Sequence, residues 1–290
     1  SDLLHMGARA RAAALALAQV PTEEKNRILL AMADELAARQ DAILEANARD
    51  MAAAETNGLT AAMKDRLRLD PKRLAAMADG VRQVAALPDP VGEVLAAWER
   101  PNGLRIEKKR VPIGVIGIIY EARPNVTSDA AALCFKSGNA TILRGGKESV
   151  HSNMAVTAAL QAGGQRAGMP ADCIQLIPTV DREAVRVLCG MDKHLDLIIP
   201  RGGKGLIETV VSLARMPVIK HYDGVCHLYV DDAADLDMAV KLVVNGKAQK
   251  PSACNALESL LVHQSVAAPF LTRLLPALAA AGVTLRADEH

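Results

Sequence analysis

The part of the chain that decides the fold is residues 111–149, which read VPIGVIGIIYEARPNVTSDAAALCFKSGNATILRGGKES. Two short apolar runs, Val115 to Ile119 and Ala140 to Leu143, flank a segment with a helical pattern. Each run is too short for a helix and too apolar for a strand with one face in water, so we expect strands covered on both faces. Strand, helix and strand in this order predict parallel strands joined by a crossover helix.

The same alternation continues beyond residue 149. Further short apolar runs lie at Ile174 to Ile177, Leu195 to Ile199 and Val218 to Ile219, with helical stretches between them. The pattern predicts a doubly wound parallel α/β sheet, which binds ligands at the carboxyl ends of its strands. Helix boundary residues are expected along this region: N-caps at Ser128, Ser149 and Asp181, and a helix end at Gly138-Asn139.

The chain before this sheet is expected to be helical, with a hairpin at its end. Leu74, Met77 and Val81 form one apolar stripe behind the helix start signal Asp70-Pro71. Within residues 94–111, two extended runs flank Pro101-Asn102-Gly103, and Asn-Gly favours a hairpin turn because both residues tolerate positive φ. We expect a protruding hairpin here, with an ordinary surface loop as the alternative.

The composition narrows the class of protein. Lysine plus arginine (34) nearly balances aspartate plus glutamate (33), and aromatic residues make up only 2%, so nucleic acid is not an expected partner. No apolar run approaches the roughly 20 residues of a membrane helix, so no membrane contact is expected. The five cysteines lack zinc-site spacing, and with no leader segment they favour reduced thiols in a cytoplasm. No metal is expected.

Two glycine-rich loops of one design follow two of the expected strands. They are Arg144-Gly145-Gly146-Lys147 and Arg201-Gly202-Gly203-Lys204-Gly205. Glycines let backbone N–H groups approach an anion, and the start of a helix adds partial positive charge. The pair predicts a dinucleotide or phosphate site, although such turns are common in α/β folds. Neither loop matches a P-loop or a GxGxxG motif, which disfavours a nucleotide kinase and a conventional Rossmann site.

Two groups of titratable residues are candidates for chemistry. Cys254 lies in a polar, proline-bearing stretch, residues 247–258, whose two lysines would favour the reactive thiolate. A structural cysteine is the commoner interpretation of such a pattern. His221 begins a titratable cluster, residues 221–223, that would either move protons or simply be solvated.

Four separated stretches carry a resemblance to a known family. Residues 111–149, 196–205, 224–231 and 253–263 resemble, in the same order, the γ-glutamyl phosphate reductase family of the aldehyde dehydrogenase superfamily. The resemblance implies NADPH-dependent reduction of L-glutamyl 5-phosphate to glutamate 5-semialdehyde with release of phosphate, the second step of proline biosynthesis. It also implies a homo-oligomer, dimer or higher, and contact with a separate glutamate kinase.

The resemblance implies a domain organisation as well. Residues 1–93 and 112–230 would form the NADPH-binding domain, residues 94–111 an oligomerisation hairpin, and residues 231–290 an incomplete catalytic domain, since family members continue further. We therefore expect the chain alone to bind NADPH weakly without turning over substrate.

The resemblance also assigns roles to residues. Cys254 would be the nucleophile, and Asn125 would stabilise the oxyanion, because Ala122 stands where the superfamily usually has an asparagine. Arg144 and Lys147 would favour NADPH by meeting its 2′-phosphate. The residues expected to border the cofactor are Arg144, Gly145, Gly146, Lys147, Gly202, Gly203, Lys204 and Gly205. A hydrolytic aldehyde dehydrogenase is the nearest alternative; the general-base glutamate it needs is missing near His221. A fragment without catalytic activity is the other alternative.

Overall fold

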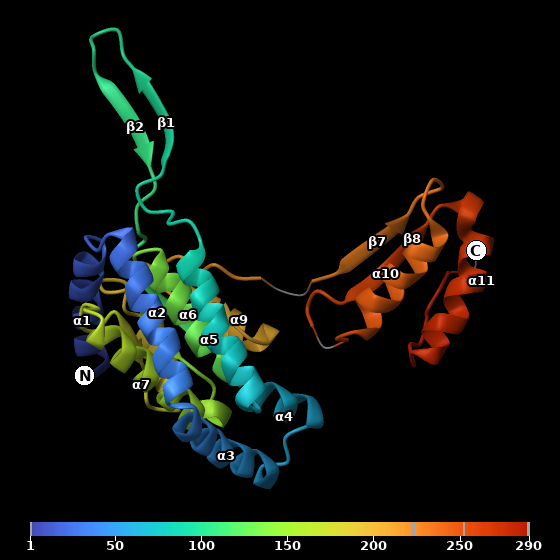
Figure 1. The fold of residues 1–290 in the computed structure, drawn as a ribbon, viewed down its shortest axis with the longest axis horizontal. Coiled ribbons are helices and arrows are strands. Elements are labelled where there is room, and N and C mark those ends of the chain that lie inside the picture. The colour runs from blue at the N-terminus through green and yellow to red at the C-terminus, as the bar shows by residue number, and fades with distance from the viewer. Residues whose placement is uncertain (1, 222–223, 252, 289–290) are drawn as a thin grey trace. The chain divides into compact units, whose positions relative to one another are not determined.

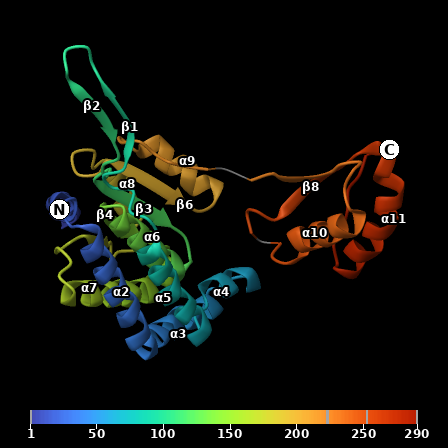
Figure 2. The same ribbon diagram turned by 45° about the horizontal axis from the view of Figure 1, so that its top comes forward.

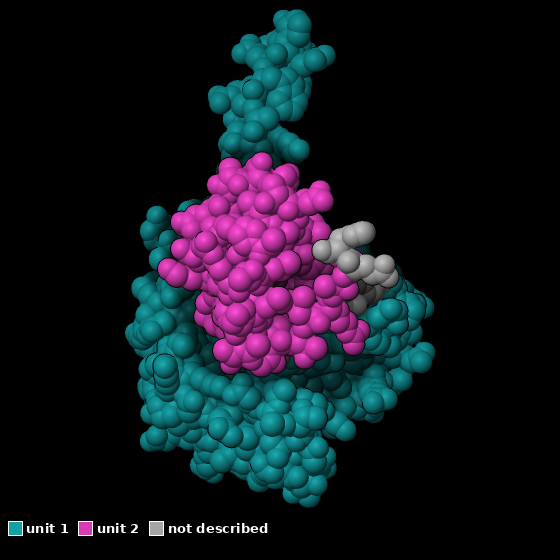
Figure 3. Space-filling model, turned by 90° about the vertical axis from the view of Figure 1, so that its right-hand side faces the viewer, with its two compact units in different colours: residues 1–220 teal, residues 221–290 magenta. Residues whose placement is uncertain are grey.

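A computed structural model describes residues 2–221, 224–251 and 253–288. The chain forms two compact units, residues 1–220 and residues 221–290, which Figure 3 distinguishes by colour. Each unit has its own hydrophobic cluster. In the described residues, no helix is long and apolar enough to cross a membrane.

Helices fill the chain before the first strand, as predicted. They are α1 (Asp2–Leu17), α2 (Thr22–Ala38), α3 (Gln40–Thr56), α4 (Ala61–Leu67) and α5 (Pro71–Ala86). Helix α5 begins at the predicted signal, because the side chain of Asp70 accepts the N–H of Arg73. The stripe of Leu74, Met77 and Val81 is buried in the core of the first unit.

The predicted parallel sheet is confirmed, with strand order β5-β4-β3-β6. Its strands are β3 (Val115–Tyr120), β4 (Ala140–Arg144), β5 (Ile174–Leu176) and β6 (Leu197–Arg201). The last expected run contributes one parallel bridge, from Val218 to Ile198. Since β4 and β6 pair with opposite edges of β3, the sheet is doubly wound, and its switch point lies between β3 and β6.

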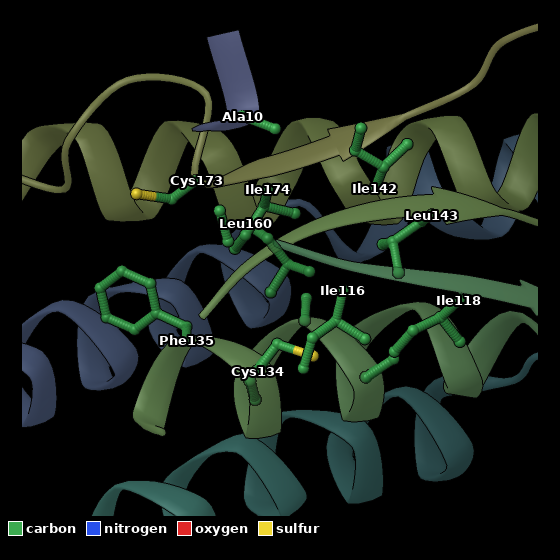
Figure 4. Packing of buried hydrophobic residues seen from close by; sticks show 14 of the residues in the cluster. Ala10, Ile116, Ile118, Cys134, Phe135, Ile142, Leu143, Leu160, Cys173 and Ile174 are labelled. Carbon is green, nitrogen blue, oxygen red and sulfur yellow. The ribbon is translucent and has the colours of Figure 1, made fainter. Parts of the chain in front are cut away.

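The helices that follow the strands cover the sheet (Figures 1 and 2). They are α6 (Pro124–Lys136), the 3₁₀ turn η1 (Lys147–Ser149), α7 (Val150–Arg166), α8 (Glu183–Cys189) and α9 (Lys204–Leu213). Figure 4 shows Ile116 of β3, Cys134 of α6 and Leu160 of α7 within one buried apolar cluster. Burial on both sides explains why the strands consist of apolar residues without polar alternation.

Two of the expected helix boundaries are confirmed: Ser149 is the N-cap of α7, and Gly138, at a φ of +77°, follows the end of α6. The N-cap of α8 is Arg182, one residue after the expected Asp181, whose carboxylate accepts the N–H of Glu183. The expected N-cap at Ser128 is wrong, because that residue lies inside α6. The helix begins earlier, at Pro124, whose fixed φ suits the first helical position.

The predicted hairpin is also confirmed. Strands β1 (Val94–Glu99) and β2 (Arg105–Lys109) pair antiparallel around the Asn-Gly turn, where Gly103 adopts a φ of +83°. The hairpin extends away from the helices of its unit (Figure 1) and leaves Trp98 45% and Leu104 57% exposed.

The second unit is built on a parallel pair of strands, β7 (Cys226–Val230) and β8 (Leu257–Val262). Helices α10 (Leu236–Ala248) and α11 (Gln264–Ala280) supply the rest of its core, which includes Phe270. The division between units falls after Lys220, earlier than the boundary at residue 230 expected from the sequence. The reason is that β7 pairs with β8 and not with the sheet of the first unit.

Candidate active site

Cys254 is the exposed thiol of the protein. The described residues include all five cysteines, of which Cys134, Cys173 and Cys189 are buried and Cys226 is half-buried. Burial raises the pKa of Cys134 and of Cys173 to about 12 and that of Cys189 to about 11. Since the thiolate is the nucleophilic form, these buried groups are unsuited to attack a substrate. Accessibility therefore singles out Cys254.

The backbone that carries Cys254 is anchored to the start of β7. The Cys226 thiol donates to the carbonyl oxygen of Cys254 across 3.7 Å. A Cβ atom on Gly224 would lie 2.7 Å from the same oxygen, so the two segments approach as closely as they do because residue 224 is glycine. These contacts fix the chain at Cys254 from within its own unit.

Asn125 lies on the first turn of α6, in the first unit, and is exposed. Its amide nitrogen donates to Asp129 at 3.0 Å, and burial raises the pKa of that carboxyl. Cys254 and Asn125 belong to different compact units. Their joint action at one substrate is therefore part of the proposal below. Of the expected cluster at residues 221–223, only His221 is among the described residues.

The first glycine-rich loop leaves β4 in a crowded backbone environment. A Cβ atom on Gly145 would overlap the amide nitrogen of Asn153, and one on Gly146 would lie 3.2 Å from the backbone nitrogen of Ala122. Lys147 is exposed at the start of η1. Close neighbours within the protein thus require glycine at both positions.

A buried hydrogen-bond network supports this loop from beneath. The Tyr120 hydroxyl bonds with that of Thr127, which donates to the side-chain oxygen of Asn153 at 3.0 Å. Asn153 in turn donates to the Ser149 hydroxyl at 3.0 Å, and Ser149 bonds back to the carbonyl of Gly146. Sequence reasoning missed this network; the polar pair Ser149 and Asn153, four residues apart at a helix start, was the available signal.

An open hollow lies beside the first loop, at the carboxyl ends of β4 and β5. The hollow is small and open to solvent, and its lining includes Gly145, Gly146, Val150, Thr179 and Val180. This is the sheet edge at which doubly wound folds bind ligands. The hollow is therefore a candidate for part of a dinucleotide site.

The second glycine-rich loop lies at the same edge of the sheet, after β6. Gly203 is the N-cap of α9 and donates its N–H to a carboxylate oxygen of Glu121, which follows β3. A Cβ atom on Gly202 would lie 2.7 Å from the Glu121 side chain, whereas one on Gly205 would meet no atom within 4 Å. Lys204 is exposed, with its ammonium 4.0 Å from Glu208. Strand pairing thus places the two loops on opposite sides of the end of β3, the first after β4 and the second after β6.

The comparisons with known proteins define the class to which this fold and these residues belong. The model of the aldehyde dehydrogenase family matches residues 1–289. The chain therefore belongs to the aldehyde dehydrogenase family, whose members use a nicotinamide cofactor. It is an oxidoreductase, and the predicted fold class is confirmed.

Within this family, the chain is similar to γ-glutamyl phosphate reductases. The chain is 56% identical over 286 residues to a γ-glutamyl phosphate reductase of Mesorhizobium japonicum, covering 98% of this chain and 67% of the relative. It is 57% identical over 284 residues to that of Moorella thermoacetica, covering 98% and 68%. The crystal structure of the γ-glutamyl phosphate reductase from Thermotoga maritima matches with a TM-score of 0.91 at 41% identity, covering 98% of this chain and 68% of that one. The predicted resemblance to γ-glutamyl phosphate reductases is confirmed, and the chain spans about two thirds of their length.

Proposed function

We propose that this protein catalyses the NADPH-dependent reduction of L-glutamyl 5-phosphate to L-glutamate 5-semialdehyde with release of phosphate, the second step of proline biosynthesis. The observation that carries the proposal is the 52% to 57% identity to reductases of that name over 98% of the chain. The exposed thiol of Cys254 supports it, because acyl transfer to an enzyme needs an accessible nucleophile.

Cys254 carries the acyl group in this mechanism. Its thiolate attacks the γ-carbonyl carbon, a carbon–sulfur bond forms, and the bond to phosphate breaks, which leaves a thioester on Cys254. NADPH, when bound, supplies the hydride that reduces this thioester. The carbon–sulfur bond then breaks, the aldehyde leaves, and Cys254 is again a thiolate. Both steps pass through a tetrahedral oxyanion, which Asn125 and backbone N–H groups near Cys254 would stabilise.

The two glycine-rich loops would hold NADPH. Their residues fit a dinucleotide because both loops lie at one edge of the sheet, the first of them beside the hollow, and each contains two adjacent residues without a side chain, Gly145-Gly146 and Gly202-Gly203. Backbone N–H groups of these glycines would bind the pyrophosphate of the cofactor. Gly205, in the first turn of α9, would border the same site. Lys147 and Lys204 would add positive charge, and Arg144 would border the same site.

The wider setting of the enzyme follows from the same family. The hairpin of β1 and β2, with Trp98 and Leu104 exposed, would contact further copies of the chain in a dimer or higher oligomer. Aldehyde dehydrogenases are commonly oligomeric, which favours this role. Contact with a glutamate kinase would shorten the path of a reactive acyl phosphate. Because Cys254 acts only as a free thiol, a reducing cytoplasm would suit it.

The test of this function is phosphate dependence in the reverse direction. The chain, and a version extended to the length of its relatives, would be incubated with glutamate 5-semialdehyde and NADP. We expect NADP reduction by the longer form only when phosphate is present, since phosphate must cleave the thioester. Reduction that proceeds steadily without phosphate would identify a hydrolytic aldehyde dehydrogenase and contradict the proposal. No reduction by either form under any condition would contradict it as well.

A further inference from the structure

The side chain of Arg144 connects the two walls of the hollow. One terminal nitrogen, Nη1, donates to the carbonyl oxygen of Gly145 at 3.0 Å. The other, Nη2, donates to the carbonyl oxygen of Val180 at 3.0 Å and lies 3.5 Å from that of Asp181, residues 36 and 37 positions along the chain. We call these contacts the Arg144 bridge.

The bridge reaches a segment that has little other support. Residues 178–182 follow β5 without regular structure and are exposed. Ile177 is still bonded to β4, through the carbonyl oxygen of Leu143. Beyond Ile177, the start of α8 bonds to the carboxylate of Asp181 and to the carbonyl oxygen of Arg182, while Arg144 supplies the hydrogen bonds that reach Val180 and Asp181 from the sheet. Among these hydrogen bonds of the described residues, the wall of the hollow that contains Thr179 and Val180 is thus tied to the first glycine-rich loop by the side chain of Arg144.

The guanidinium group is largely occupied by these backbone contacts. Its Nε atom is shielded from solvent and has no acceptor among the described residues. Burial lowers the pKa of Arg144, which is the direction expected for a cation partly removed from water. Lys147 differs, because it belongs to the same loop and is exposed.

We infer that Arg144 is a positioning residue, which holds residues 179–181 against the first glycine-rich loop and so shapes the hollow for the nucleotide end of a nicotinamide cofactor. The preference for NADPH over NADH would then come from Lys147, whose ammonium would contact the 2′-phosphate. This inference rests on the proposed NADPH site, and it replaces the expectation that both cations read the phosphate.

A conservative substitution separates positioning from charge recognition. Arg144→Lys keeps the positive charge, but a single ammonium cannot replace two terminal nitrogens that donate to the carbonyls of Gly145 and Val180. If Arg144 read the 2′-phosphate by charge, Arg144→Lys would keep most of the preference for NADPH. If it holds the wall, Arg144→Lys and Arg144→Gln must weaken NADPH and NADH alike.

The experiment combines cofactor titration with amide hydrogen exchange, on the whole chain and the variants Arg144→Lys, Arg144→Gln and Lys147→Gln. We expect both Arg144 variants to raise the Kd of NADPH and of NADH by about tenfold each, which leaves their ratio unchanged. Without cofactor, exchange at residues 178–182 should be faster in both, while exchange in Val115–Tyr120 stays slow and shows that the sheet is intact. Lys147→Gln should narrow the ratio between the Kd of NADH and the Kd of NADPH and should leave hydrogen exchange at residues 178–182 unchanged.

Two results would overturn the inference. One is an Arg144→Gln variant in which the Kd of NADPH rises while that of NADH is unchanged, so that the ratio of the two narrows. That result would mean that Arg144 binds the 2′-phosphate. The other is unchanged exchange at residues 178–182 in both Arg144 variants. If the unaltered chain bound neither cofactor, the proposed NADPH site would fail, and hydrogen exchange would still decide whether Arg144 holds the wall.

Discussion

The Oε1 atom of Glu121 accepts the N–H of Gly203 at 3.0 Å, which joins residues 82 positions apart at the switch point of the sheet. Glu121 follows β3, and its own N–H is bonded to the carbonyl of Arg201 at the end of β6. A carboxylate therefore lies at the N-terminus of α9, where the second glycine-rich loop is proposed to meet the cofactor. Such an anion stabilises the free helix end and competes with a phosphate for the same N–H.

Removal of the Glu121 charge should strengthen cofactor binding. Glu121→Gln keeps an oxygen that can accept from Gly203 but removes a charge near the proposed pyrophosphate, which is repulsion of about 1 kcal/mol. We expect the Kd of NADPH to fall about fivefold in a fluorescence titration at low salt, with a smaller change at high salt. An unchanged or weaker affinity at low salt would mean that no cofactor phosphate approaches Gly203.

Two glycines in helices should respond oppositely to alanine. A Cβ atom on Gly163 of α7 would overlap the backbone oxygen of Ala31 in α2, whereas Gly205 of α9 faces open space. Gly163→Ala should destabilise the protein by about 1–3 kcal/mol, because neither helix can move without strain. Gly205→Ala should stabilise it by up to about 1 kcal/mol, because alanine restricts the unfolded chain. Denaturant unfolding measures both, and equal effects would contradict the packing of α7 on α2.

The buried thiols should make the first unit sensitive to alkali. Burial raises the pKa of the Cys173 thiol from its ordinary value of 9.0 to about 12, so the contribution of this thiol to stability is complete below pH 9 and is lost as the pH rises toward 12. The gap in unfolding free energy between the unaltered chain and Cys173→Ala should therefore shrink by about 1 kcal/mol from pH 8 to pH 10. Comparing the two at each pH cancels the titration of other groups. A constant gap would mean that Cys173 is accessible to water.

Trp98 can report on the proposed contact through the hairpin. It is the only tryptophan in the sequence and is 45% exposed in the single chain. If copies meet through β1 and β2, dilution should lower the mass in sedimentation and shift the Trp98 emission to longer wavelength over the same concentration range. Trp98→Lys should weaken assembly without loss of secondary structure. Dissociation with unchanged emission would place the contact elsewhere.

The fold could largely be predicted because its signals are local. Short apolar runs predicted β3 and β4, and Asn-Gly predicted the turn between β1 and β2. The predictions failed where two residues competed to begin a helix and where strand pairing involved residues far apart in the sequence. Ser128 was a suitable N-cap, but Pro124 started the helix before it. The unit boundary depended on the pairing of β7 with β8, which no local pattern shows.

The candidate site was predictable in part for the same reason. Its glycines and Cys254 were visible as residue types in a pattern. The structure gives Gly145, Gly146 and Gly202 close neighbours and leaves the thiol exposed. What the sequence could not show were contacts between residues distant in the chain. The bridge from Arg144 to Val180 and the bond from Glu121 to Gly203 both depend on which strands are neighbours.

The most direct test of the central claim is a single-turnover reaction in the reverse direction, with glutamate 5-semialdehyde and NADP but no phosphate, in the chain extended to the length of its relatives. The hemithioacetal on Cys254 would lose hydride to NADP, and the thioester would then remain because no phosphate cleaves it. We predict a burst of one NADPH per active chain and a γ-glutamyl group on the peptide with Cys254 by mass spectrometry. Added phosphate should remove this group from Cys254 as γ-glutamyl phosphate. Cys226→Ser, which keeps a donor for the Cys254 carbonyl, should behave like the unaltered protein, and Cys254→Ala should give no burst. A full burst from Cys254→Ala, or a γ-glutamyl group on another residue, would contradict the account.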